Sequence, residues 1–147
     1  MDIDDLNWKI LKCLQQNARL SNAEIGRQVG ISSPAVSERI KKMEDLGIIE
    51  GYKAIVAPLS VGYQLKALIT LRAFMGKLKP FLAKVKTYDE VVNCYRITGD
   101  ENIVMEVVLE NQKHLEKFID QLIIYGESKT QIVLSRVIRQ KELKPVK

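Results

Sequence analysis

The chain has 147 residues, of which 46% are hydrophobic and 28% charged, and its formal net charge is +5. This composition is typical of a globular protein with a buried core and excludes a disordered or low-complexity chain. No apolar run reaches the ~20 residues that a membrane helix needs, and the acidic start is unlike a secretory signal. We therefore expect a cytoplasmic protein that does not interact with membranes.

Residues capable of redox, metal or acid-base chemistry are few. Cys13 and Cys94 lie far apart in apolar segments, so we expect two buried free thiols rather than a disulfide. The single histidine, His114, lies in a charged stretch and is expected at the surface. The sequence contains no phosphate-binding glycine loop, metal-ligand cluster or nucleophile beside a histidine. We expect a protein that is not an enzyme and has no cofactor or metal.

Three short helices are predicted in the first part of the chain. Apolar residues at helical spacing indicate a helix over residues 4–17. Ser21, followed three residues later by a glutamate, is typical of a capping box for a second helix that ends at Gly30. A serine cap followed by Pro34 starts a third helix that reaches about residue 46. A short helix, a glycine turn and a second capped helix make up a helix-turn-helix.

The third predicted helix has one packing face and one free face. Val36, Ile40 and Met43 share the first, because they repeat at helical spacing. The free face is either a solvated surface or a surface that reads DNA; the local excess of five Lys and Arg over two Glu in residues 19–42 favours DNA. The residues expected at base edges are Ser33, Pro34, Ser37 and Glu38, and those expected at phosphates are Arg39, Lys41 and Lys42. No Arg, Asn or Gln lies at the centre of this face, so we expect modest sequence specificity aided by DNA shape.

The remainder of the chain alternates between strand and helix patterns. Turn signals place an extended linker at residues 51–63, between a DNA-binding domain at 1–50 and a second domain at 64–147. The expected elements are strands at 65–74, 91–98, 103–109 and 130–138, and helices at 78–85 and 112–122. This βαββαβ order predicts a ferredoxin-like sandwich and an α+β protein overall. The uncovered sheet face predicts at least a dimer, and residues 136–147 are expected to be a solvated tail, with a phosphate contact as the alternative.

The sequence resembles the Lrp/AsnC family of transcription regulators, also called leucine-responsive, asparagine or feast/famine regulators, over essentially the whole chain. The residues that carry the resemblance are Ile3-Asp4, Ile10-Leu11, Leu14-Gln15, Ala18-Arg19, Val29-Gly30-Ile31-Ser32, Ala35-Val36, Arg39-Ile40-Lys41-Lys42-Met43-Glu44, Gly47-Ile48-Ile49 and Gly51-Tyr52. The resemblance implies a winged helix-turn-helix, double-stranded DNA as partner, and association with the nucleoid. It also implies dimers that assemble into tetramers, octamers or larger rings.

The resemblance further implies control by an amino acid or related metabolite bound between dimers, near the loop between the second and third strands. Here that loop contains Gly99, Asp100, Glu101 and Asn102, where Asn102 replaces a second acid common in the family, and Thr130 matches a family threonine near the same region. Turn amides could hold a carboxylate while Asp100 or Glu101 pairs with an ammonium; the alternative is a plain hairpin turn. An architectural protein that wraps DNA with little effector response remains an open alternative. A ligand-binding module whose DNA-binding half is vestigial is a further alternative, and Lys41 and Arg39 argue against it.

Overall fold

A computed structural model describes residues 3–147 and divides the chain into two compact units. The first unit, which we call the helical unit, extends to Ala54 and also includes Ile138–Lys147; the second, the sheet unit, is Ile55–Val137. This division differs from the expected second domain at 64–147, because the chain returns to the first unit after leaving the sheet. It also places the 3₁₀ turn Pro58–Val61, inside the expected linker, in the sheet unit.

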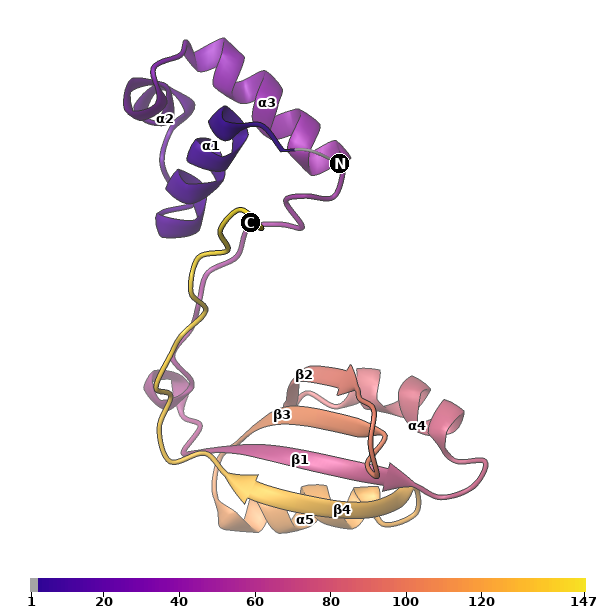
Figure 1. Ribbon diagram of the computed structural model, residues 1–147. Coiled ribbons are helices and arrows are strands. Elements are labelled where there is room, and N and C mark those ends of the chain that lie inside the picture. Colours follow the sequence, from indigo (N-terminus) through magenta and orange to yellow (C-terminus); the bar gives the residue numbers. More distant parts are fainter. Residues whose placement is uncertain (1–2) are drawn as a thin grey trace. The chain divides into compact units, whose positions relative to one another are not determined.

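The helical unit contains the three predicted helices, α1 Asp5–Gln16, α2 Asn22–Val29 and α3 Ser33–Asp45 (Figure 1). Each begins at a side chain that accepts a hydrogen bond from the first turn: Asp4, Ser21 and Ser32. The predicted capping box at Ser21 is complete, and α2 ends at Gly30 in the left-handed conformation, with φ 81°. The buried core of the unit is formed by Ile10, Leu11, Cys13, Ile25, Val36 and Met43.

The sheet unit has four antiparallel strands in the order β2-β3-β1-β4. The strands are β1 Leu65–Ala73, β2 Val91–Arg96, β3 Ile103–Leu109 and β4 Gly126–Ile132. The helices α4 Leu78–Lys84 and α5 Gln112–Leu122 lie behind the sheet in Figure 1, and α4 is followed by a 3₁₀ turn, Val85–Thr87. This arrangement confirms the predicted ferredoxin-like fold and the α+β class.

One core joins the two helices to the sheet. Alternate residues of β1 and β3, such as Ile69 and Met105, point toward α4 and α5 and are fully buried against Phe81 and Phe118. Phe118 also contacts Tyr88 edge-on, with ring centroids 5.3 Å apart. This packing fixes the strand register, and the register decides which side chains reach the opposite sheet face.

The opposite sheet face mixes apolar and charged side chains. Leu68 and Val104 lie half-buried on it, beside an ion pair in which Lys66 Nζ lies 3.1 Å from Glu106 Oε1. Burial raises the pKa of Glu106, but hydrogen bonds from Lys66 and Asn93 outweigh it and lower the pKa overall. This face is therefore polar in part.

Two sequence expectations about the sheet unit are wrong. The last strand is Gly126–Ile132 rather than 130–138. It lies at the edge of the sheet, where a strand can form from largely polar residues, so the more apolar residues that follow it were a misleading signal. Cys94 is exposed rather than buried, because it lies on the other edge strand, β2; Cys13 is buried as expected. Among residues 3–147, no helix is long and apolar enough to cross a membrane.

Candidate DNA-binding and effector sites

Helix α3 presents a polar face to solvent. Val36 and Met43 are buried in the helical unit, and Ile40 packs against the same core. On the other side the predicted base-contacting residues Ser33, Pro34, Ser37 and Glu38 are all exposed, as are Lys41 and Lys42. Helix geometry thus brings six of the seven predicted DNA-binding residues to the surface.

The seventh residue, Arg39, is held by α1. Its Nη1 donates to Asp4 Oδ2 at 2.7 Å and to Asn7 Oδ1 at 3.0 Å, and its side chain is 34% exposed. The hydrogen bond from Arg39 lowers the pKa of the Asp4 carboxyl, and the backbone N–H of Asn7 lowers it further. Arg39 therefore connects the start of α1 to the middle of α3, a role that the sequence analysis missed because these residues are distant in the chain.

Two further contacts shape the surface of α3. Lys41 Nζ lies 3.1 Å from Asp45 Oδ2, in an exposed pair one helical turn apart. Tyr52 donates its hydroxyl to Glu44 Oε1 at 2.9 Å and so fastens the chain that follows α3 to that helix. Desolvation, together with the nearby carboxylate of Glu44, raises the pKa of Tyr52 to about 12, so the phenol remains a donor.

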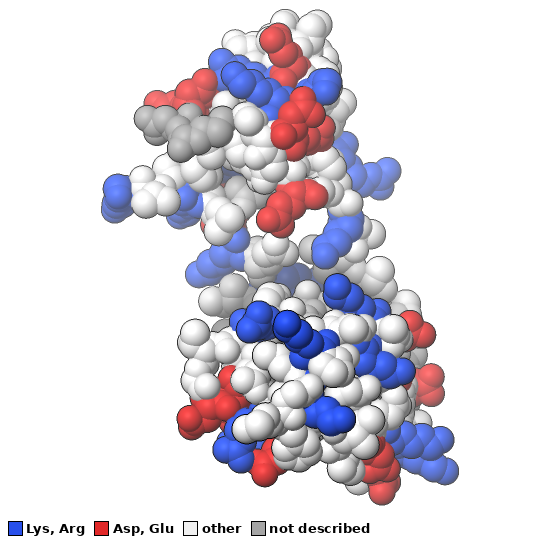
Figure 2. All heavy atoms as spheres, turned by 90° about the vertical axis from the view of Figure 1, so that its right-hand side faces the viewer, with Lys and Arg blue, Asp and Glu red and all other residues white. Residues whose placement is uncertain are grey.

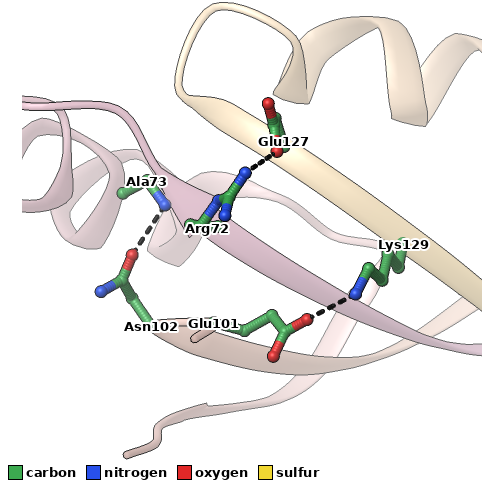
Figure 3. Close-up of polar contacts among 6 residues, drawn as sticks. All are labelled: Arg72, Ala73, Glu101, Asn102, Glu127 and Lys129. Atoms are coloured by element: carbon green, nitrogen blue, oxygen red, sulfur yellow. Dashed lines mark hydrogen bonds and ion pairs between the residues drawn. The ribbon is translucent and has the colours of Figure 1, made fainter. Parts of the chain in front are cut away.

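The loop between β2 and β3 is a hairpin tied to β1, and Figure 3 shows the bond between its Asn102 and Ala73 of β1. Ile97 N donates to Asn102 O at 2.9 Å, and Gly99 has a φ of 109°, which favours glycine. Asn102 N donates to Leu71 O at 2.9 Å, and Ala73 N donates to Asn102 Oδ1 at 2.7 Å. The Asn102 side-chain oxygen thus accepts a hydrogen bond from the backbone at the end of β1. A carboxylate oxygen at this position, as in the acid that Asn102 replaces, could accept the same bond.

Charged residues on β1 and β4 surround this loop. Lys129 Nζ lies 2.9 Å from Glu101 Oε1, and Arg72 forms an ion pair with Glu127 (Figure 3). The bond between Lys129 and Glu101 lowers the pKa of the carboxyl and raises that of the amine. Asp100 is exposed and forms no ion pair within the described residues.

The structure brings four of the five predicted effector residues together and separates the fifth. Thr130 pairs with Ile69, whose side chain is buried against the helices, whereas Lys129 pairs with Thr70 on the opposite face. Sequence reasoning overlooked Arg72, Glu127 and Lys129. The alternation in β4 could have indicated Glu127 and Lys129, had the strand been placed at 126–132. The described part of the chain has no group of three His, Cys, Asp or Glu that could hold a metal ion.

Comparisons with known proteins extend these observations. Residues 3–50 match the winged helix-turn-helix DNA-binding model, and residues 66–143 match the Lrp/AsnC ligand-binding domain model. The chain belongs to the Lrp/AsnC family. It is 37% identical to the uncharacterized HTH-type transcriptional regulator YezC of Bacillus subtilis over 133 residues, which cover 90% of this chain and 94% of that protein.

Solved structures of Lrp/AsnC-type proteins agree with the fold. AsnC of E. coli superposes with a TM-score of 0.86 at 30% identity, covering 96% of this chain and 98% of AsnC. A transcriptional regulator from Neisseria meningitidis, solved in complex with L-Met, superposes with a TM-score of 0.91 at 28% identity and covers 97% of each chain. This Lrp/AsnC protein therefore combines a DNA-binding helix-turn-helix with a ligand-binding domain, and its named relatives are transcription regulators.

Proposed function

We propose that the chain regulates transcription by binding specific duplex DNA sites through α3 and by responding to an amino acid or a close relative. One observation carries the DNA-binding half of the proposal. The capped helix α3 exposes Ser33, Ser37 and Glu38 opposite its buried Val36 and Met43. In a helix-turn-helix, the first turns of the second helix enter the major groove, where such side chains meet base edges.

Within this proposal Lys41 and Lys42 contact phosphates and position the helix, without reading sequence. Arg39 has a supporting role, because its guanidinium already donates to Asp4 and Asn7. An isolated helix-turn-helix contacts one half-site, so we propose that copies associate through their sheet units into at least dimers that span two half-sites. Half-buried Leu68 and Val104 on the open sheet face support this association.

The effector half of the proposal concerns the loop at residues 99–102. Glu101 is engaged by Lys129, so Asp100 is the acid we assign to the effector's ammonium, while N–H groups of the turn bind its carboxylate. The related Neisseria meningitidis regulator with bound L-Met supports an amino acid as the effector class. An effector bound between dimers would shift the equilibrium between oligomeric states toward the state that it binds more tightly.

A second candidate function is architectural wrapping of DNA with little effector response. The absence of Arg, Asn and Gln among residues 33, 34, 37, 38 and 41 favours it, because these side chains provide the strongest base readout. Genome-wide mapping of bound sites, with and without an amino-acid pool, separates the two functions. A limited set of sites that changes with the pool supports regulation, whereas broad binding that ignores the pool supports wrapping.

A further inference from the structure

Residues 138–147, which we call the return segment, pack on α1 of the helical unit. The Gln15 side chain makes two hydrogen bonds to one backbone residue: its Nε2 donates to Leu143 O at 3.2 Å, and its Oε1 accepts from Leu143 N at 2.8 Å. Beside it, Gln16 Nε2 donates to Glu142 Oε1 at 2.8 Å. Residues 136–147 were expected to be a solvated tail, whereas these contacts attach Glu142 and Leu143 of that stretch to α1.

The surface that receives the return segment is the outer stripe of α1. Trp8, Lys12 and Gln16 repeat every four residues and so lie on one side of the helix. Together with Lys9 they line a groove whose other wall is Glu142, Leu143, Lys144 and Pro145. Ile10 and Leu11 of the same helix are buried in the core, so α1 packs on both sides.

The hydrogen bonds that dock the return segment do not involve its basic side chains. Gln15 binds the backbone of Leu143, and the one side chain of the segment that forms a hydrogen bond with α1 is Glu142. The cations of the segment are all exposed: Arg139, Lys141, Lys144 and Lys147. Replacing Arg139, Lys141 and Lys147, which do not line the groove, should therefore change the charge of the segment without removing the bonds that hold it.

The return segment also changes the charge of the unit it joins. Residues 3–54 carry eight Lys and Arg against seven Asp and Glu, whereas residues 138–147 carry four Lys and Arg against one Glu. On the side shown in Figure 2, the helical unit in the upper part of the view presents acids beside bases. Most of the net positive charge of the DNA-binding unit comes from the return segment.

We propose that the return segment is a functional part of the DNA-binding unit: docked on α1, it supplies the positive charge that draws duplex DNA toward α3. This inference rests on the proposed DNA-binding function. The physical reason is that the summed field of a basic surface accelerates encounter with DNA even where no single phosphate is contacted, and that salt screens this field.

The single tryptophan makes docking measurable without DNA. Trp8 lines the groove, so its emission maximum and its quenching by acrylamide report whether the return segment is in place. A chain truncated after Val137 and the full-length double variant Gln15→Ala, Gln16→Ala should both give a red-shifted emission and more quenching. Circular dichroism of the full-length variant checks that the three helices remain folded.

DNA binding then tests the role of the charge. A docked but neutral segment is made by replacing with glutamine the three cations that do not line the groove: Arg139, Lys141 and Lys147. The matched control replaces three exposed lysines of the sheet unit with glutamine: Lys77, Lys79 and Lys86. The neutral segment should keep the wild-type Trp8 emission and bind DNA about tenfold more weakly at low salt, with the difference shrinking as salt rises. The control should bind nearly as wild type.

Three results would overturn the proposal. Unchanged Trp8 emission after truncation would mean that the segment does not dock. Unchanged DNA affinity of the neutral segment would remove the role of its charge. An equal loss in the sheet-unit control would assign the effect to the net charge of the chain. Full-length protein that binds no duplex DNA would instead reject the proposed DNA-binding function, while the Trp8 measurement still decides docking.

Discussion

Replacement of Lys42 by alanine should remove one phosphate contact and nothing else. Lys42 is exposed on α3, and no ion pair engages it within the described residues. Each phosphate neutralised by a protein cation contributes about 0.9 to the slope of log affinity against log salt. We therefore expect the slope of Lys42→Ala to be smaller than that of wild type by about one unit on specific and non-specific duplexes alike.

The same reasoning gives the size of the affinity change. A fourfold rise in salt, from about 50 to about 200 mM, should weaken wild type about 3.5-fold more than a variant that lacks one contact. Lys42→Ala should thus differ most from wild type at low salt. Fluorescence anisotropy of a labelled duplex over this range measures the slope, and Lys113→Ala on α5 serves as an exposed control in the other unit.

Arg39→Ala should behave differently, because the Arg39 guanidinium donates hydrogen bonds to Asp4 and Asn7, whereas no ion pair engages Lys42 within the described residues. We expect it to keep the wild-type salt slope and to lower the melting temperature of the helical unit. A Lys42→Ala slope equal to wild type would contradict the placement of α3 against the duplex. A reduced slope for Arg39→Ala would mean that Arg39 leaves Asp4 when DNA binds.

Three further predictions concern the effector loop, acid stability and the sheet core. Asp100→Ala should abolish the effect of an amino-acid effector on assembly while leaving unliganded DNA affinity unchanged; calorimetry that finds wild-type effector binding by this variant would exclude the assigned role. Since folding lowers the pKa of Asp4 below its ordinary value of 3.8, its contribution is present above that pH and is lost as pH falls through the lower folded-state pKa. Unfolding of wild type and Asp4→Asn should therefore differ at neutral pH and converge in acid, and a difference that persists in acid would assign the effect to another group. Phe118→Ala removes a fully buried ring packed edge-on against Tyr88 and should cost about 3–5 kcal/mol of sheet-unit stability in urea unfolding; a loss under ~1 kcal/mol would show that the core collapses around the cavity.

The features predicted correctly from sequence are those set by local chemistry. The starts of α2 and α3 follow from Ser21 and Ser32, because a cap bonds to the backbone three residues away. The loop at 99–102 and the buried β3 strand were recognised for the same reason, since a turn signal and a short apolar run are local patterns. The order of the helices and strands recognised from such local patterns was enough to predict the fold.

The features that were missed depend on contacts between distant residues. Arg39 looked free because nothing near it in sequence reveals its bond to Asp4. Lys129 and Arg72 join the effector loop only through the pairing of β4 with β1, and a polar edge strand gives a weak pattern in sequence. The docking of Leu143 on Gln15 spans most of the chain and follows from no local signal.

The return of residues 138–147 to α1 also fixes an order of events during synthesis. Helices α1, α2 and α3 leave the ribosome first and can pair with one another, because their contacts are close in sequence. The groove on α1, however, receives its occupant only after the whole sheet unit has been made. A nascent chain that has not yet made the return segment therefore carries a helix-turn-helix without it, so the DNA-binding unit starts to fold before the sheet unit and is completed after it.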